Sequence, residues 1–194
     1  MGILFMKYLI KVKNFSKKYR VEEVIIEEIL ISKRITLIQG KNGCGKSTIL
    51  KAIAGLVSYE GVIEVNGKVS YMSEFPSFPV DLSVKEFIGS LYKISTSKTS
   101  LEEVKNLYEI FKLDNKTDLL LSSLSKGMKA KVNLVQSLME KADIYLLDEP
   151  ISGLDNDGVK CLIKYLKNSM KSFVISTHLI DDFNKIHDEV IELW

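Results

Sequence analysis

The sequence predicts an α/β protein whose mixed sheet has an antiparallel β N-terminal part and carries an inserted α-helical block. Three observations lead to this fold class. Short β-branched stretches fill the early part of the chain, helical periodicity fills the middle, and strands alternate with helices at the end. Such alternation is typical of a parallel sheet covered by helices. A chain of 194 residues, 46% of them hydrophobic, is long enough to bury one substantial core.

Extended segments are expected at the start of the chain. Apolar or alternating residues at 8–12 and 24–30 indicate strands of an antiparallel start. A β-branched run at 34–39 predicts a third strand, which ends at Gly40, and residues 47–56 have helical spacing.

A hairpin is expected next, because two further strands flank a dipeptide that favours tight turns. That dipeptide is Asn66-Gly67, and the flanking strands are expected at 62–65 and 69–72. We therefore predict that these two strands pair with each other.

The middle of the chain, residues 83–141, is expected to be helical. It begins at Ser83 with S-V-K-E, which resembles a capping box. One helical face is marked by the apolar residues Val104, Leu107, Tyr108 and Phe111. Strands are then expected at 144–147, 172–176 and 190–193, and helices at 156–168 and 179–186. The helical block is therefore an insertion on the surface of the sheet.

Composition and charge argue against several classes of protein. A formal net charge of +2 is too small to indicate a nucleic-acid partner. The two cysteines, Cys44 and Cys161, lack metal-ligand spacing, and a reducing, intracellular compartment fits them best. No apolar run reaches the ~20 residues that a membrane-spanning helix needs. Residues 1–7 lack a basic leader and a cleavage site, so we expect no signal peptide, and Met6 is a second candidate for the native start.

The segment 40–48 carries the strongest chemical signal. It reads G-K-N-G-C-G-K-S-T, matches the phosphate-binding pattern G-x-x-x-x-G-K-[ST], and lies between a predicted strand and a predicted helix. Lys46 is expected to reach the β- and γ-phosphates, and the Ser47 hydroxyl to ligate Mg²⁺. A plain glycine-rich turn is the alternative, but roughly one chain in 150 would match by chance. The expected ATP-binding residues are Gly40, Lys41, Asn42, Gly43, Cys44, Gly45, Lys46, Ser47 and Thr48.

A second group of chemical residues follows the apolar strand at 144–147. The carboxylates of Asp148 and Glu149 are delivered to the C-terminal edge of the sheet, where ligands of α/β proteins bind. Asp148 is expected to hold Mg²⁺ through the water shell of the ion, and Glu149 to polarise the attacking water. The segment alone is equally compatible with a strand that runs into a polar loop. Its position downstream of a phosphate-binding loop favours the catalytic interpretation.

With these motifs the whole chain resembles the nucleotide-binding domain of an ABC (ATP-binding cassette) ATPase, a P-loop NTPase. Residues 124–128, L-S-K-G-M, resemble the family signature L-S-G-G-Q. The resemblance implies that the signature faces a γ-phosphate bound by a second subunit. A serine cap with a glycine at a helix start is the structural alternative. The signature residues are Ser125, Lys126, Gly127 and Met128.

Further motifs carry the same resemblance. Residues 152–155 resemble the D-loop, which in the family crosses the dimer interface, and His178 resembles the switch histidine that contacts the γ-phosphate. Tyr19 lies where the family places an aromatic ring on adenine, and Phe15 is the alternative for a ring in this region, with a core role also open. The D-loop residues are Ser152, Gly153, Leu154 and Asp155.

Two motifs depart from the family pattern. Glu74 stands where the family has a glutamine, so the implied metal ligands are Ser47, Asp148 and Glu74. A carboxylate can still ligate Mg²⁺, but the substitution puts in doubt the usual coupling of this loop to a membrane partner. The signature has Lys126 and Met128 in place of glycine and glutamine. Lys126 either adds positive charge near the opposing γ-phosphate or is simply solvated.

The resemblance implies one ABC nucleotide-binding domain over residues 1–194. Residues 1–74 and 142–194 would form a RecA-like core, and 75–141 a helical subdomain that carries the signature. The implied activity is ATP hydrolysis, with ATP and Mg²⁺ bound and with Glu149, His178 and Lys46 as the catalytic residues.

The implied partners are a second ABC ATPase subunit, identical or different, and a separate transmembrane permease, with no nucleic acid. The protein would be cytoplasmic and peripheral on the cytoplasmic face of the membrane. Two alternatives stay open: a soluble ABC ATPase without a transport role, and a weakly hydrolysing regulatory subunit. Mechanical ATPases of the chromosome type fit poorly, because Ser125 follows Lys46 too closely for long coiled coils between them.

Overall fold

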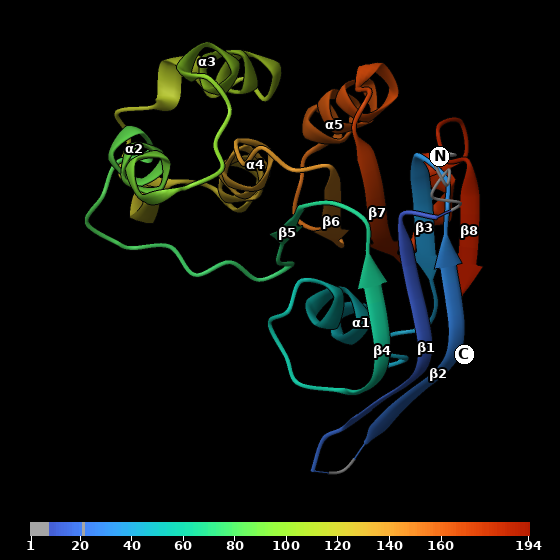
Figure 1. Ribbon diagram of the computed structural model, residues 1–194. Helices are drawn as coiled ribbons and strands as arrows, with labels where there is room; N and C mark the ends of the chain where they lie inside the picture. Colours follow the sequence, from blue (N-terminus) through green and yellow to red (C-terminus); the bar gives the residue numbers. More distant parts are fainter. Residues whose placement is uncertain (1–7, 21) are drawn as a thin grey trace, which may run out of the picture.

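A computed structural model describes residues 8–20 and 22–194, which form two sheets with helices packed around them (Figure 1). Residues 1–7, including the candidate start at Met6 and the segment expected to hold no signal peptide, lie outside the described residues. The antiparallel sheet has the order β2-β1-β4. Its strands are β1 (Ile10–Lys18), β2 (Glu23–Ile31) and β4 (Glu60–Val65). The predicted antiparallel start is therefore confirmed.

The central sheet is parallel and has five strands in the order β5-β6-β7-β3-β8. The strands are β3 (Ile35–Gln39), β5 (Val69–Met72), β6 (Ile144–Asp148), β7 (Ser172–Thr177) and β8 (Glu189–Glu192). Helix α5 (Asn156–Asn168) connects β6 to β7, which are parallel neighbours. The strand–helix alternation expected for this region thus produces the expected parallel sheet.

Two hydrophobic cores lie on opposite faces of the central sheet, and the pleat decides which residues belong to each. In β6, Ile144 and Leu146 join the core on the side of the antiparallel sheet, while Tyr145 and Leu147 join the core under the helical block. Both sets are fully buried. A strand buried on both faces reads as a continuous apolar run, as the sequence of β6 does.

The helices divide between these two cores. Helix α1 (Lys46–Ile53) packs with the antiparallel sheet, whereas the remaining helices contribute to the other core. Three of them, α2 (Val84–Ile94), α3 (Leu101–Ile110) and α4 (Lys126–Leu138), gather on the β5 side of the molecule (Figure 1). Short 3₁₀ turns occur at Asp114–Lys116, Leu121–Ser123 and Ile180–Phe183.

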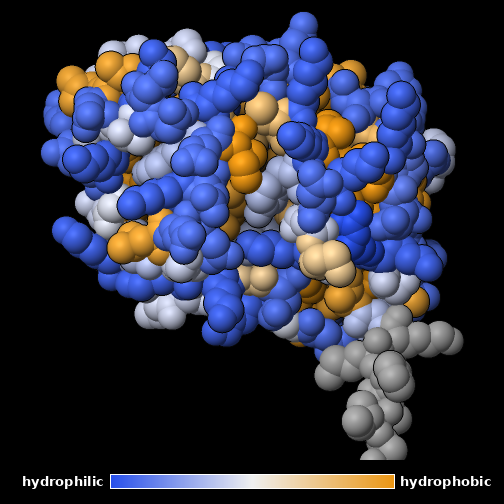
Figure 2. All heavy atoms as spheres, turned by 90° about the horizontal axis from the view of Figure 1, so that it is seen from above, coloured by the Kyte–Doolittle hydropathy of each residue, from blue (hydrophilic) through white to orange (hydrophobic). Residues whose placement is uncertain are grey.

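Within 8–20 and 22–194, no helix combines the length and the apolarity needed to cross a bilayer. The face seen in Figure 2 is mostly hydrophilic, with hydrophobic side chains in small separate groups.

The hairpin predicted around Asn66-Gly67 is wrong, because its two strands belong to different sheets. Strand β4 pairs antiparallel with β1, and β5 pairs parallel with β6. The Asn66 side chain donates to the Tyr8 carbonyl, and the Asn66 backbone N–H donates to the Leu9 carbonyl. Both bonds attach Asn66 to the antiparallel sheet. Gly67, at φ +137°, then turns the chain toward the central sheet. Long-range pairing has overridden the local turn preference.

The helix predicted at 179–186 is also wrong, since only a 3₁₀ turn, Ile180–Phe183, forms there. The Asn184 side chain donates to the Asp181 carboxylate, a local bond of the kind that competes with helix propagation. Phe183 is fully buried and anchors the turn against the core. Asp188 then accepts the N–H of Ile35, which fixes the entry into β8.

The predicted capping box at the start of α2 is present. Ser83 Oγ accepts from the Glu86 N–H, and the Glu86 carboxylate accepts from the Ser83 N–H at 2.8 Å. Ser83 is buried, so bulk water cannot replace the hydrogen bonds of its hydroxyl.

Removing this cap is expected to destabilise the protein. Ser83→Ala should lower the free energy of unfolding by about 1 kcal/mol, the typical cost of losing an N-cap side chain. Ser90→Ala, on the exposed face of the same helix, is the matched control and should change it by less than about 0.5 kcal/mol. Urea denaturation of both variants measures the difference. Equal stability of the two variants would show that the box contributes nothing.

Candidate nucleotide-binding site

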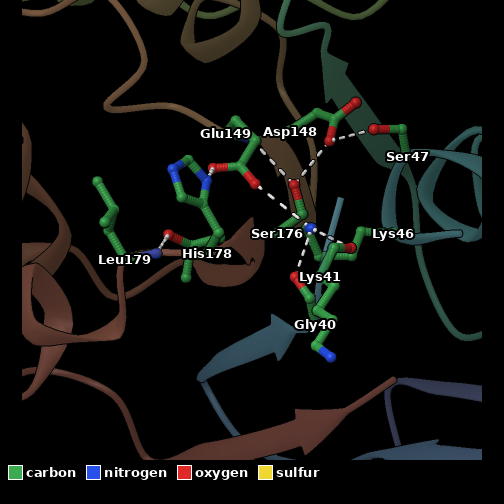
Figure 3. A network of polar contacts seen from close by, with 10 residues as sticks. Gly40, Lys41, Lys46, Ser47, Asp148, Glu149, Ser176, His178 and Leu179 are labelled. Atoms are coloured by element: carbon green, nitrogen blue, oxygen red, sulfur yellow. Dashed lines mark hydrogen bonds and ion pairs between the residues drawn. The ribbon is translucent and has the colours of Figure 1, made fainter. Parts of the chain in front are cut away.

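The C-terminal ends of three parallel strands bring the predicted site residues together at one edge of the central sheet. Gln39 of β3 lies beside Thr177 of β7, and Asp148 of β6 lies beside Ser176 of β7. The residues that immediately follow these strands therefore emerge side by side. Figure 3 shows the resulting network of polar contacts.

The loop after β3 is shaped by glycines and leads directly into α1. Gly45 has φ +100°, and a Cβ there would lie 2.4 Å from Val24 Cγ1, so no larger residue fits. Helix α1 begins at the next residue, Lys46. A loop of this kind directs backbone N–H groups and the positive end of the helix dipole toward one point, where an anion is favoured.

Lys46 is buried and its charge is held inside the site. Its Nζ donates to the carbonyl oxygens of Gly40 (2.7 Å) and Lys41 (3.2 Å). It also lies 3.7 Å from Glu149 Oε1. These partners are the backbone of its own loop and a single carboxylate. A phosphate group at this point would offer the ammonium group stronger, fully charged acceptors.

Asp148 lies at the centre of a group of hydroxyl donors. Ser47 Oγ donates to Asp148 Oδ1 at 2.9 Å, and Ser176 Oγ donates to the same oxygen at 2.6 Å. The phenol of Tyr71 donates to Oδ2 at 3.0 Å. The phenol pKa of Tyr71 is raised by burial and by the negative charge of Asp148, so the hydroxyl keeps its proton and remains the donor.

Glu149 lies in a backbone conformation that non-glycine residues rarely adopt, with φ +46°. Two acceptors on Ser176 hold its N–H there, the side-chain Oγ at 3.0 Å and the carbonyl oxygen at 3.2 Å. Its carboxylate is only 5% exposed and lies between Lys46 and His178, whose Nδ1 is 2.9 Å from Oε2. Strain of about 1–3 kcal/mol that is kept by such contacts points to a functional role.

A cavity of ≈ 420 Å³ opens beside these residues. Tyr19 lies at its wall, with its hydroxyl 3.3 Å from Thr48 Oγ1. Phe15, the alternative aromatic residue, is 0% exposed and packs against Tyr59, so it has a core role and only Tyr19 is open to a ligand. The cavity is lined by Tyr19, Glu22, Val24, Asn42, Gly43, Gly45, Lys46, Ser47, Thr48, Glu74, Phe75, Glu149 and His178. The predicted Gly40, Lys41 and Cys44 belong to the same loop but do not line this cavity.

Glu74 lines the same cavity and faces two other carboxylates. Burial, followed by the nearby charges of Glu149 and Asp148, raises the pKa of the Glu74 carboxyl. Its loop is fixed from behind, because the Asn133 side chain of α4 donates to the Ser73 carbonyl at 2.7 Å. Glu74, which stands where the family has a glutamine, therefore lies within the site.

The signature lies outside this cavity. Ser125 caps α4 by accepting the Met128 N–H at 3.2 Å, so its cap role is real. Both Ser125 and Lys126 are exposed, while Gly127 and Met128 are half-buried. None of the four lines the cavity described above.

The D-loop residues pack directly against the signature of the same chain. The Lys126 side chain lies over Gly153, where an added Cβ would meet its Cε at 3.0 Å. Asp155 caps α5 through the Gly158 N–H and pairs with Lys131 of α4 at 3.1 Å. The Ser152 N–H donates to the Glu149 carbonyl, and the Leu154 N–H donates to the Ile151 carbonyl. Residues 152–155 therefore connect the turn at Glu149 to helix α4, which carries the signature.

The sequence patterns did not assign a role in the site to Tyr71, Ser176 or Asn133, nor to the cavity-lining residues Glu22, Val24 and Phe75. Tyr71 and Ser176 lie in predicted strands close to recognised motifs, and a polar residue at the end of a parallel strand is a signal that could have found Ser176. Asn133 lies within a helix and its role depends on tertiary contact, which no sequence pattern records.

Comparisons with known proteins agree with this geometry. The family model for ABC transporters matches residues 28–152. An ABC transporter ATP-binding protein of Methanocaldococcus jannaschii is 33% identical, over 97% of this chain and 75% of its own length. A Bacillus subtilis ABC transporter ATP-binding protein, YthP, is 33% identical over 90% of this chain and 77% of its own.

Solved structures include the ATP-binding subunit of an ABC transporter, which superposes with a TM-score of 0.81 at 26% identity, covering 95% of this chain and 85% of that one. The chain belongs to the ABC transporter family and is an ATP-binding protein with the ABC ATPase fold.

The raised pKa of Glu74 predicts a pH dependence of stability. The pKa of this carboxyl is higher in the folded state than its ordinary value of 4.5. Its contribution to the free energy of unfolding is therefore present in full at pH values below 4.5 and is lost as the pH rises above that value. Glu74→Gln has no proton to lose, so its stability relative to the wild type should grow as pH increases and then level off. Denaturation midpoints of both proteins without nucleotide, measured between about pH 4 and pH 8, test this. A constant difference across that range would contradict it.

Proposed function

We propose that this chain is the ATP-binding and ATP-hydrolysing subunit of an ABC transporter, which energises transport through a separate membrane-domain chain by ATP-driven dimerisation. One observation carries the proposal. Lys46, Glu149 and His178 form one connected chain of contacts beside the cavity, and Ser47 and Asp148 are bonded to each other within the same site. This is the set of groups that phosphoryl transfer to water requires: a phosphate ligand, a metal site and a base.

The contacts of Lys46 support its role as a phosphate ligand. Its Nζ would exchange the Gly40 and Lys41 carbonyls for the β- and γ-phosphate oxygens of ATP, while the N–H groups of the loop and of α1 bind the same phosphates. The exposed ring of Tyr19 would lie against the adenine. When Lys46 moves to the phosphates, its ion pair with Glu149 would break, and the Glu149 carboxylate would be released.

Glu149 and His178 support the hydrolytic step. The Glu149 carboxylate lies 2.9 Å from His178 Nδ1, and the Glu149 backbone is held by Ser176. The carboxylate is therefore oriented before the reaction begins. Glu149 would take the proton of the attacking water as it bonds to the γ-phosphorus, and the β–γ bridging oxygen would leave with ADP. His178 would position the base and contact the γ-phosphate.

The residues present fit a magnesium ion. Ser47 Oγ and Asp148 Oδ1 are 2.9 Å apart, and the Glu74 carboxyl shares the cavity with Ser47. Hydroxyl and carboxylate oxygens are the ligands that Mg²⁺ prefers, together with phosphate oxygens of the substrate. When bound, the ion supplies neutralisation of phosphate charge. Ser47, Asp148 and Glu74 would hold it.

Dimerisation is supported by the location of the signature. Residues 125–128 begin the 13-residue helix α4, are exposed or half-buried, and lie outside the cavity of their own chain. An exposed helix N-terminus suits an anion supplied by another molecule. A second subunit, identical or different, would therefore place its signature over this chain's γ-phosphate, with residues 152–155 at the interface.

The permease partner is supported by apolar side chains beside the Glu74 loop. Phe75 is 81% exposed and Val80 is 62% exposed, both between β5 and α2. Exposed large apolar residues in one loop favour a protein contact. We place the membrane partner there, with this chain on the cytoplasmic face. Residues 75–141 would transmit movement as one helical subdomain, attached to a core of residues 1–74 and 142–194.

Replacing the proposed base tests the hydrolytic role. Glu149→Gln should bind MgATP but hydrolyse it roughly 100-fold more slowly or worse, because an amide cannot accept the proton. The bound nucleotide should then keep two subunits together, visible as a dimer by light scattering. Glu109→Gln, the same change on an exposed face of α3, is the control and should match the wild type. Unchanged turnover in Glu149→Gln would remove Glu149 from the mechanism.

Partner capture tests the transport role. Tagged Glu149→Gln protein is recovered from detergent-solubilised membranes of the native host with MgATP present, and partners are identified by mass spectrometry. A polytopic membrane protein that is retained with MgATP, and lost with a Lys46→Ala bait, is the expected result. Recovery as a homodimer alone would favour an ABC ATPase without a transport role. Slow turnover in the wild type, relieved by Glu74→Gln, would indicate a regulatory subunit.

A further inference from the structure

The carboxylate of Asp148 is held by hydroxyl groups rather than by a cation. It is only 2% exposed. Its Oδ1 accepts from Ser47 and Ser176, and its Oδ2 accepts from Tyr71. Among the described residues no lysine, arginine or histidine lies within ion-pair distance of it, since Lys46 pairs with Glu149 instead. The anion is therefore stabilised by neutral O–H donors.

The three donors have different duties. Ser47 belongs to the phosphate-binding loop and is itself a proposed ligand of the metal. Ser176 also accepts the N–H of Glu149, so it serves two acidic residues at once. Tyr71 is neither a proposed metal ligand nor a contact of Glu149, and the bond to Oδ2 is what joins its phenol to Asp148. Its effect on Asp148 can be separated from every other function of the site.

The ring of Tyr71 is fixed by the fold. Tyr71 lies in β5, opposite Leu146 of β6, and Asp148 follows two residues later on that neighbouring strand. The ring packs against the apolar core shared by α1 and the antiparallel sheet. A phenol has few rotatable bonds, so a ring held by packing delivers its hydroxyl to one position.

We propose that Tyr71 is a positioning residue for Mg²⁺: its hydroxyl fixes the rotation of the Asp148 carboxylate, so that Oδ1 stays bonded to Ser47 in the arrangement that would hold the ion. This inference rests on the proposed function. Without the bond, Oδ2 loses its one donor among the described residues, and only the two serine bonds to Oδ1 still restrain the carboxylate. Rotation about its χ2 torsion, which is broad for this side chain, then becomes easier. Outer-shell bonds of this kind orient metal ligands and strengthen metal binding.

A matched comparison exists in the same sheet. The Tyr145 hydroxyl is also bonded, but to the backbone carbonyl of Glu140 and the N–H of Ala142, away from the site. Tyr71→Phe and Tyr145→Phe each remove one bonded hydroxyl and keep the ring. A merely structural role for Tyr71 predicts the same behaviour from both variants.

The test measures how nucleotide binding depends on Mg²⁺, with a fluorescent ATP analogue and the wild type, Tyr71→Phe and Tyr145→Phe. Tyr71→Phe should raise the Mg²⁺ concentration for half-maximal effect by about 10-fold, the lower end of the range for such outer-shell changes. Its affinity for the analogue without Mg²⁺ should be unchanged, and Tyr145→Phe should match the wild type. ATP hydrolysis measured against Mg²⁺ concentration should shift in parallel.

The outcomes separate this inference from the function on which it rests. A wild-type protein that binds no MgATP overturns the proposed function. A wild type that binds MgATP in a Mg²⁺-dependent way, with an identical dependence in Tyr71→Phe, overturns the role of Tyr71 alone. An equal shift in both variants also overturns it, because the effect would then come from loosening of the sheet.

Discussion

The parallel alignment of β3, β6 and β7 is the constraint on which the rest of the structure depends. Parallel neighbours end at the same edge, so the chain leaves these strands at three adjacent points. The strand interiors are buried on both faces and are almost entirely apolar. Polar chemistry is therefore excluded until each strand ends. This geometry brings together the loop after β3, the two acids at the end of β6 and the histidine after β7, although Ser47 and Asp148 are 101 positions apart in the sequence.

Burial of charge at this edge explains the contacts that the site makes. Lys46, Asp148 and Glu149 are all buried, and a buried charge without partners is costly. Lys46 and Glu149 partly satisfy each other, whereas Asp148 relies on hydroxyl donors. The interactions are good enough to hold the groups in place but weaker than those a phosphate and a metal ion would supply. These contacts thus stabilise the fold, and replacing them with contacts to a phosphate and a metal ion would contribute favourable free energy to ligand binding.

Much of the fold and the centre of the site could be predicted from the sequence, because their signals are local. The run 40–48 and the acids at the end of β6 are recognised from adjacent residues alone. The structure brings Lys46, Glu149 and His178 together, as their positions after strands imply. Errors arose where distant contacts decide the outcome. Asn66-Gly67 favours a hairpin locally, but β4 and β5 find partners in different sheets. The contribution of Tyr71 depends on β5 lying next to β6, and that pairing has no signature in the chain.

The central claim is that this sheet edge binds ATP through Lys46 and Ser47. A crystal structure of the wild-type chain with Mg²⁺ and a non-hydrolysable ATP analogue tests it most directly. We expect that Lys46 Nζ leaves the Gly40 and Lys41 carbonyls for the phosphates, that Ser47 contacts the metal, and that the adenine lies against Tyr19. Lys46 still bonded to both carbonyls, with the analogue elsewhere on the surface, would contradict it.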